Sequence, residues 1–499
     1  MISGMSCPSR CRFCMRRPHE KLSLTQGLTF EGALVILKPE TKFKPKRRKI
    51  MAKLTVRFDK KLGRIKPLHG VGQPPFVGTD FSYFHYLTEA NIPFSRLHDV
   101  GGAYGGNLYV DIPNLFRDFD ADEYDPASYD FAFTDLLLRK LVEAGVEPYF
   151  RLGVTIENYI YVKAYRINPP KDPAKWARIC EHVIRHYNEG WANGFHYGIT
   201  YWEIWNEPDN GINDATNQMW SGTPEEFYEL YRVTSKHLRA CFGDSIKIGG
   251  YASCGFYAVN DINTPNAEAL GLSEEPNDWE MRTAFFVRFF DGFLDMVKRE
   301  QLPLDFFSHH SYGDVAKTVF MNRYAAKRLA EAGYGDVEIH INEWHTYPGK
   351  ATRGTDKCCA SATAMMLAMQ NEKMDVMCYY DARMGISIYG GLFNPMAEEP
   401  YCTYYGFKAF GKLYKMGVQA ECVSDTDGLY AIAATDETGS EKGLLIANIG
   451  EETTVETGLE GDFTVYEIDE AHLFTPSEKK ADRFVLGNNK VVYIEKTQA

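Results

Sequence analysis

The chain has 499 residues, of which 44% are hydrophobic and 24% charged, and its net charge is −12. This composition is typical of a globular protein with one large domain and a smaller one, and it excludes an intrinsically disordered chain. The acidic balance argues against nucleic acid as a partner, and without a run of about 20 apolar residues or an export signal we expect no membrane partner and a cytoplasmic location.

The first 50 residues differ from the rest of the chain. Cys7, Cys11 and Cys14 have the spacing C-x3-C-x2-C, which resembles the iron–sulfur motif of radical enzymes that use S-adenosylmethionine. Those enzymes have the triplet after their first barrel strand, whereas no strand-like run precedes it here. We therefore expect no metal and no cofactor, and we interpret residues 1–50 as a disordered or non-native leader before a natural start at Met51. A mature terminus upstream of Met51, found by mass spectrometry, would contradict this interpretation.

Residues 51–65 contain a short alternating strand at 54–58, and from there apolar strand-like runs alternate with helical patterns. The eight expected strands are 67–72, 93–100, 147–154, 200–206, 246–251, 304–310, 337–343 and 375–381. The expected helices are 81–90, 128–144, 173–188, 224–242, 279–300, 314–332, 358–372 and 403–416. Eight strands that are each followed by a helix predict an α/β fold, a closed (β/α)8 TIM barrel over residues 66–416. An open doubly wound sheet is the alternative, but Gly70-Val71-Gly72 lacks the spacing of its phosphate loop.

Residues 417–499 change to short alternating segments separated by turns such as Asp427-Gly428. The segments are 429–434, 443–447, 453–457, 463–468, 483–486 and 491–494. This pattern predicts a C-terminal antiparallel β-sandwich domain. The strand at 54–58 is expected to join it, because an exposed sheet edge is usefully covered by another part of the chain.

The strongest functional signal is the stretch 201–209, which reads YWEIWNEPD. Its aromatic and β-branched first half is typical of a strand that Pro208 ends, so Glu207 is expected at the C-terminal rim, where barrel active sites lie. Burial among aromatic side chains is expected to raise the pKa of Glu207 towards that of a general acid. The plainer alternative is an ordinary strand-end glutamate beside a turn.

Glu343 ends the seventh expected strand in the same way. Strand alternation predicts that Ile339, Ile341 and Glu343 share the inward face, opposite Glu338 and His340. An inward carboxylate is costly unless it is used or paired, and a solvated loop glutamate is the alternative. Strands four and seven lie across the barrel mouth, a span that two glutamates could narrow to the roughly 5 to 5.5 Å required for retaining glycoside hydrolysis.

With these residues the chain resembles the retaining glycosidases whose two catalytic glutamates end strands four and seven of a (β/α)8 barrel. It is most similar to glycoside hydrolase family 39, from about residue 54 to the C-terminus, and residues 202–209 are the most specific part. The resemblance implies that Glu207 is the acid/base and Glu343 the nucleophile. It also implies that Asn206 holds the sugar 2-hydroxyl, that His310 contacts substrate hydroxyls, and that Tyr312 lies against the nucleophile.

Weaker resemblances place His69 and His98 in the sugar pocket. Four aromatic residues either stack on sugar rings or simply pack in the core: Trp202, Trp205, Trp344 and Tyr380. Arg151 stands where members of this family often have a glutamate. Arg96 and Arg151 either line the pocket or neutralise Glu203, which would otherwise be an unpaired inward charge.

The function expected from this resemblance is that of a retaining, β-xylosidase-like exo-enzyme, which cleaves oligosaccharides or small glycosides through a covalent glycosyl-enzyme. Alternatives on the same machinery are an α-L-arabinofuranosidase, a galactosidase and an iduronidase. The alternative from another class is a non-catalytic carbohydrate-binding protein. The sequence leaves open which sugar is bound and whether the protein forms a homo-oligomer.

Overall fold

The structure, a computed structural model, describes residues 50–497 except 78–82, 102–107, 157–166, 214–215, 347–350, 384–388, 390, 395–396 and 398. The leader with Cys7, Cys11 and Cys14 lies outside the described residues, so its interpretation stays a prediction. Within the described part of the chain, no helix combines the length and the apolar character needed to cross a lipid bilayer.

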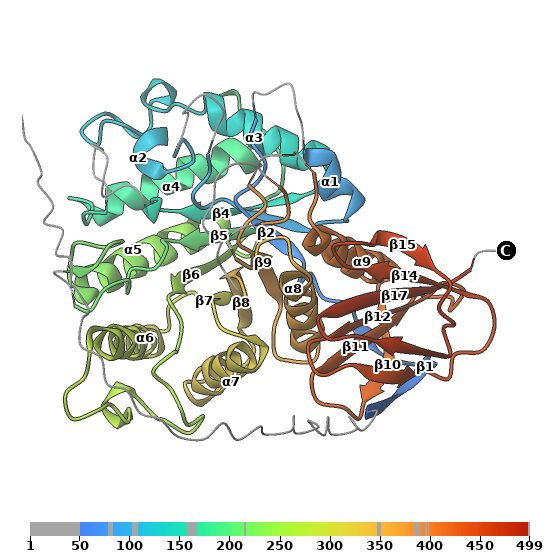
Figure 1. Cartoon of the computed structure of the whole chain (residues 1–499). Helices are drawn as coiled ribbons and strands as arrows, with labels where there is room; N and C mark the ends of the chain where they lie inside the picture. The colour runs from blue at the N-terminus through green and yellow to red at the C-terminus, as the bar shows by residue number, and fades with distance from the viewer. Residues whose placement is uncertain are drawn as a thin grey trace, which may run out of the picture. The chain divides into compact units, whose positions relative to one another are not determined.

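Eight parallel strands close into a barrel in chain order, from β2 to β9 (Figure 1). They are β2 (Gly70–Gly72), β3 (Phe94–Arg96), β4 (Glu147–Leu152), β5 (Tyr201–Ile204), β6 (Lys247–Ser253), β7 (Phe306–Ser311), β8 (Glu338–Trp344) and β9 (Val376–Tyr379). Gly70 pairs with Cys378 and thereby closes the ring between β2 and β9. Each strand overlaps one of the eight predicted ranges, so the predicted TIM barrel is confirmed.

Helices surround the strands (Figure 1). They are α1 (Phe84–Glu89), α2 (Ile112–Leu115), α3 (Ala132–Glu143), α4 (Pro173–Asn188), α5 (Pro224–Phe242), α6 (Asp278–Glu300), α7 (Val315–Glu331), α8 (Asp356–Met369) and α9 (Cys402–Met416). Local sequence explains their bounds, as α4 illustrates. The Asp172 side chain accepts hydrogen bonds from the first-turn N–H groups of Ala174 and Lys175, and Trp176 and Val183 belong to the buried stripe.

The C-terminal strands form a nine-stranded sheet in the order β15-β14-β17-β12-β11-β10-β1-β13-β16. Its strands are β1 (Ile50–Arg64), β10 (Val418–Ser424), β11 (Leu429–Thr435), β12 (Lys442–Asn448), β13 (Thr453–Glu456), β14 (Phe463–Ile468), β15 (Leu473–Ser477), β16 (Arg483–Leu486) and β17 (Lys490–Lys496). All neighbours are antiparallel except β1 and β13, so the predicted antiparallel domain is confirmed. The sequence did not reveal β10, which only Gly417 separates from α9, or β15, an edge strand that contains Pro476.

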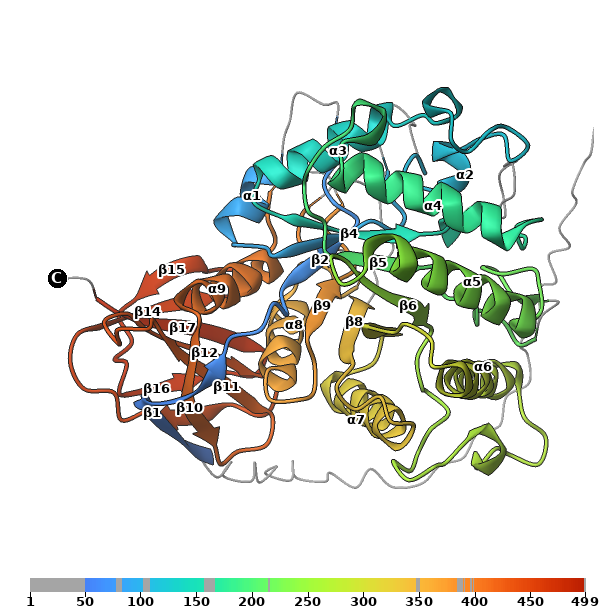
Figure 2. The ribbon, with the colours of Figure 1, turned by 180° about the vertical axis from the view of Figure 1, so that it is seen from behind.

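The sheet packs on the barrel through α8 and α9. Side chains of β12 alternate between two cores: Leu445 belongs to the large core shared with the barrel helices, and Leu444 to the sheet's own core. β1 brings the N-terminal part of the described chain into this sheet, and Figure 2 shows it beside β10. The sheet thus supports the helices that follow β8 and β9.

Candidate active site

The two predicted catalytic glutamates lie together at the C-terminal end of the barrel. Trp205 and Glu207 have positive φ angles of 74° and 45°, which turn the backbone sharply after β5. Glu343 is the penultimate residue of β8. Both side chains are buried, and one carboxylate oxygen of Glu207 lies within 4.8 Å of one of Glu343. The chain therefore brings two sequence-distant carboxylates over one cavity.

A β-bulge in β8 directs Glu343 into this site. In the pairing of β7 with β8, His309 faces Ile341 and His310 faces Glu343, so Asn342 is an extra residue. Below the bulge, His340 points into the barrel, where its ring lies 4.6 Å from that of Phe306. Simple alternation, which assigned Ile341 and Glu343 to the same inward face, was therefore wrong: the bulge reverses the parity between them.

Two side chains hold the Glu343 carboxylate from both sides. The Tyr312 hydroxyl donates to Oε1 at 2.5 Å, and Arg96 Nη1 donates to Oε2 at 3.2 Å. Arg96 also pairs with Glu203, at 2.9 Å from Nε, and donates from Nη2 to Asn206 Oδ1 at 2.6 Å. One buried guanidinium therefore connects the ends of β5 and β8 and stabilises negative charge on Glu343.

We expect the Arg96→Met variant to lose about 3 to 5 kcal/mol of unfolding free energy, because it leaves the buried Glu203 charge without its cationic partner, with only the Ser308 and Asn342 hydrogen bonds. Urea unfolding followed by tryptophan fluorescence measures this loss. The double variant Arg96→Met/Glu203→Gln removes the orphaned charge as well and should recover part of the stability. A single variant within ~1 kcal/mol of the wild type would show that the pair contributes little.

Glu207 is paired with a histidine. His310 Nδ1 lies 2.7 Å from Glu207 Oε1, and Asn210 Nδ2 donates to Oε2 at 2.6 Å. Burial alone would raise the pKa of Glu207, but the hydrogen bond and positive charge of His310 hold it below its usual value, contrary to the expected increase. Burial opposes protonation of His310, yet the negative charges of Glu343 and Glu207 raise its pKa. Both shifts favour an ionised Glu207 beside a protonated His310.

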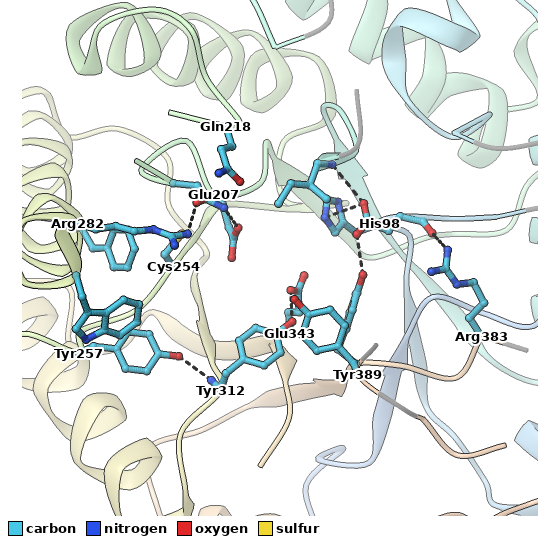
Figure 3. A pocket seen from close by; sticks show the side chains of 16 residues that line it. His98, Glu207, Gln218, Cys254, Tyr257, Arg282, Tyr312, Glu343, Arg383 and Tyr389 are labelled. Atoms are coloured by element: carbon cyan, nitrogen blue, oxygen red, sulfur yellow. Dashed lines mark hydrogen bonds and ion pairs between the residues drawn. The ribbon is translucent and has the colours of Figure 1, made fainter. Parts of the chain in front are cut away.

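A cavity of about 670 Å³ opens above the two glutamates. Three further predicted residues, His98, Tyr312 and Tyr380, line it together with Asp99, Ile156, Asn210, Gln218, Cys254, Tyr257, Trp279, Arg282, Phe286, Arg383 and Tyr389. Figure 3 shows Glu207 and Glu343 facing one another across its centre. The Tyr380 hydroxyl donates to Asp99 at 2.7 Å, and burial together with the charge of Arg96 lowers the pKa of His98. His98 thus offers a neutral imidazole.

The predicted residue Asn206 shares the Arg96 guanidinium with Glu343 and does not line the cavity itself. Its Oδ1 accepts from Arg96, whereas its Nδ2 is buried and has no hydrogen-bond partner among the described residues. His310 likewise has an unpartnered, buried Nε2 there. Buried donors of this kind usually have partners, so these two nitrogens are suited to a bound ligand or water.

Two predicted substrate-binding residues lie outside the cavity. His69 bonds through Nε2 to the Asn91 carbonyl at 2.8 Å and packs on Phe410, with ring centroids 5.3 Å apart. Burial lowers its pKa to about 3, so it is a neutral packing residue. Trp344 follows Glu343 on β8, hence points outward and stacks near Phe407 of α9.

Trp202 and Trp205 also pack outside the barrel lumen instead of lining the cavity. The Trp202 ring stacks on Phe150 at 5.0 Å, and Trp205 Nε1 donates to the Met219 carbonyl at 2.9 Å. Arg151 pairs with Asp111 at 2.6 Å, so of the two arginines expected near Glu203 only Arg96 is bonded to it.

The sequence reasoning missed the wall of the cavity formed by the β6–α6 segment. Tyr257 lies in the loop after β6, and Trp279 and Arg282 lie near the start of α6. A signal was present: Asn277 with Glu280 forms a capping box that marks the helix start. In a barrel, the helix that follows a strand begins near the active-site face, so residues near the start of α6 line the cavity just as strand ends do.

Three groups of side chains among the described residues could hold a metal ion: Glu207, His310 and Glu343; Glu181, His237 and Cys241; and Glu467, Asp469 and His472. In the first group, Arg96 and the Tyr312 hydroxyl already donate to the Glu343 oxygens. The fixed positive charge of Arg96 opposes a cation at this position.

Comparison with known proteins agrees with this geometry. The family described as glycosyl hydrolases family 39 matches residues 105–369, just over half of the chain and a span that includes Glu207 and Glu343. The chain belongs to glycosyl hydrolase family 39. The family assignment made from strand-end glutamates is thereby confirmed.

Individual relatives of this family 39 chain are distant. A β-xylosidase of Geobacillus stearothermophilus is 24% identical over 221 residues, which are 42% of this chain and 35% of that protein. The match therefore spans about a third of the curated relative. Among solved structures, a glucosidase from Croceicoccus marinus has a TM-score of 0.71 at 22% identity, covering 90% of this chain and 100% of that one. A family 39 β-xylosidase from Caulobacter crescentus has a TM-score of 0.63 at 16% identity, covering 89% and 100%. These similarities show the shared fold.

Proposed function

We propose that this protein is a retaining glycoside hydrolase, a β-xylosidase-like exo-enzyme acting on oligosaccharides or small glycosides. The observation that supports it best is the approach of Glu207 and Glu343 oxygens within 4.8 Å. Carboxyl groups in retaining enzymes are about 5 to 5.5 Å apart, whereas inverting enzymes need roughly 6.5 to 9.5 Å to admit a water molecule. The short spacing favours direct attack by one carboxylate on the sugar.

Glu343 is the nucleophile in this proposal. Tyr312 and Arg96 fix its carboxylate, and Arg96 also holds Oδ1 of Asn206, whose Nδ2 has no partner among the described residues. A donor at that point can bind the sugar 2-hydroxyl, an interaction that strengthens in the oxocarbenium-like transition state. Attack of Glu343 on the anomeric carbon forms the glycosyl ester and breaks the bond to the leaving oxygen.

Glu207 is the acid/base and works together with His310. The negative charge of Glu343 is the main factor that raises the pKa of His310 against the effect of burial. As Glu343 loses that charge on forming the ester, the pKa of His310 falls and the proton passes over the 2.7 Å bond to Glu207 and on to the leaving oxygen. In the second step Glu207 accepts a proton from the attacking water.

The substrate class rests on the size of the cavity and on the relatives. Pockets of about 300 to 1,000 Å³ hold a ligand of drug size, so a cavity of about 670 Å³ suits two or three sugar rings better than a polymer. The curated relative is named a β-xylosidase. A β-xyloside is therefore the first substrate to test.

A panel of aryl glycosides tests the proposal. We expect hydrolysis of a β-xyloside in preference to an α-L-arabinofuranoside, a galactoside, a glucoside or an α-L-iduronide, with the released sugar first observed by NMR in the anomeric configuration of the substrate. Release of the opposite anomer would contradict the retaining mechanism. Binding of sugars without cleavage of any glycoside would indicate a carbohydrate-binding protein.

The His310→Asn variant is expected to shift the basic limb of the pH profile of kcat/KM to lower pH. In the wild type, the last proton of the Glu207–His310 pair can lie on either group. Because His310 offers a second site for this proton, the pair loses it at a higher pKa than Glu207 would alone. Asparagine keeps a neutral hydrogen-bond donor but cannot hold that proton. A basic limb that stays in place would show that His310 does not share the catalytic proton.

A further inference from the structure

The position of Glu207 divides the cavity into two sides. If Glu207 protonates the leaving oxygen, as proposed above, the leaving group lies on its side, and the sugar that is attacked lies towards Glu343. Figure 3 shows Arg282, Tyr257 and Gln218 on the Glu207 side, whereas Tyr389 and Arg383 lie beyond Glu343. The residues of α6 and the preceding loop therefore form the wall that a leaving group meets.

Arg282 is a cation with unused hydrogen-bonding capacity in this wall. Among the described residues its guanidinium makes one hydrogen bond, from Nη2 to Asn210 Oδ1 at 2.5 Å, and has no carboxylate within ion-pair distance. The guanidinium carbon of Arg282 lies 5.6 Å from the centre of the Phe286 ring, and both residues line the cavity. The remaining N–H groups of Arg282 are therefore available to a ligand in the cavity. A guanidinium offers five donors in a fork that matches a carboxylate.

An exposed aromatic ring accompanies this cation. Trp279 lies three residues before Arg282 on α6, hence on the same helix face, and is 55% exposed although it lines the cavity. Its ring lies 5.7 Å from that of Tyr257. A second depression of about 330 Å³ is also lined by Asn210, Gln218, Trp279 and Arg282, so the binding surface continues outward past Arg282. An exposed indole beside such a surface is suited to stacking on a sugar or aryl ring.

Charge separates this side from the centre of the cavity. An anionic group near the reacting bond would be repelled by Glu343, which the cavity exposes together with Asp99. Beyond Glu207, Arg282 is the charged side chain that lines the main cavity, whereas Asp278 lines only the outer depression. A negatively charged group on the leaving group is therefore tolerated when it lies on the Glu207 side, one ring away from the bond that breaks.

We propose that the leaving-group side of the cavity is a subsite for a carboxylate-bearing aglycone, either a uronic acid residue or an aromatic acid, with Arg282 binding the carboxylate and Trp279 stacking on the ring. The proposal rests on the function proposed above. In this proposal Arg282 determines substrate specificity. The alternative is a purely structural role, in which Arg282 only positions Asn210, which in turn holds Glu207.

Matched substrates distinguish these roles. The 4-carboxyphenyl and 4-carboxamidophenyl glycosides of the sugar that the panel identifies differ mainly in charge. We expect the wild type to favour the carboxylate at least ~10-fold in kcat/KM, and Arg282→Gln to abolish this preference, so that kcat/KM falls at least ~10-fold more on the carboxylate than on the carboxamide. Arg282→Lys should keep part of the preference, because the charge remains without the fork. Arg288→Gln, at an exposed position of the same helix, is the matched control and should behave as the wild type.

The two sources of the carboxylate are compared with disaccharides in which the same sugar is linked to a uronic acid or to the neutral sugar of the same configuration. A preference only for the aryl acid, or only for the uronide, identifies the natural class. Equal losses on charged and neutral substrates in Arg282→Gln, or no preference in the wild type, would overturn the proposal. If neither substrate is cleaved, the proposed function has failed, and calorimetric binding of both glycosides to the wild type still decides whether Arg282 selects the carboxylate.

Discussion

Replacing Glu343 with Ala is expected to lower kcat at least ~1,000-fold on every glycoside that the protein cleaves, which corresponds to about 4 kcal/mol of transition-state stabilisation. Without this carboxylate no glycosyl ester forms. Azide, a small anion that fits the space freed beside Tyr312 and Arg96, should restore turnover. NMR of the product should show a glycosyl azide of inverted anomeric configuration, because a single displacement takes place.

Glu338→Gln is the matched control for this variant. Glu338 lies at the opposite end of β8, where its carboxylate accepts from Tyr201 at 3.0 Å and lies away from the cavity. The control should keep near-normal kcat. Near-normal activity of Glu343→Ala, or a retained glycosyl azide, would refute the nucleophile assignment.

The second large effect is expected for Glu207→Ala, and it depends on the leaving group. Poor leaving groups, such as alkyl alcohols, need the proton and should lose roughly 100- to 10,000-fold in kcat/KM. A dinitrophenyl glycoside needs no acid in the first step, so the glycosyl-enzyme should form rapidly and then accumulate, visible as a burst of dinitrophenolate. Azide should speed its breakdown and give a glycosyl azide of retained configuration, the product of two displacements.

Glu225→Ala, an exposed glutamate in the first turn of α5, serves as the control and should show neither the burst nor the azide product. Equal losses on good and poor leaving groups would argue that Glu207 only binds or positions the substrate. The opposite anomeric outcomes expected for the two azide products test both assignments with one reagent.

The sequence was sufficient to predict the barrel, because each strand-like run and each helical pattern is locally distinct. It also predicted both glutamates, since Pro208 marks the end of one strand and Glu343 the end of another. It could not predict how Glu343 reaches the cavity. The bulge at Asn342 depends on pairing between β7 and β8, a long-range feature that no local period records.

The protonation of Glu207 was mispredicted for a related reason. Burial was visible from the aromatic neighbours, and on its own it raises a carboxyl pKa. The opposing charge comes from His310, more than 100 residues further along the chain, and its effect outweighs that of burial. Similarly, Arg96 bonds both Glu203 and Glu343. This pairing is visible only in the folded barrel, where β3, β5 and β8 come together.

The position of β1 restricts how this architecture can be divided. β1 lies between β10 and β13, so the chain leaves the C-terminal sheet to build the barrel and then returns to the same sheet. A fragment cut after α9 would retain β1 without β10 and β13. Both edges of β1 would then lack backbone hydrogen-bond partners, and an apolar face of α8 and α9 would be exposed. The barrel therefore depends on strands from both sides of it in the sequence, and recombination that preserves folding has to exchange β1 together with β10 to β17.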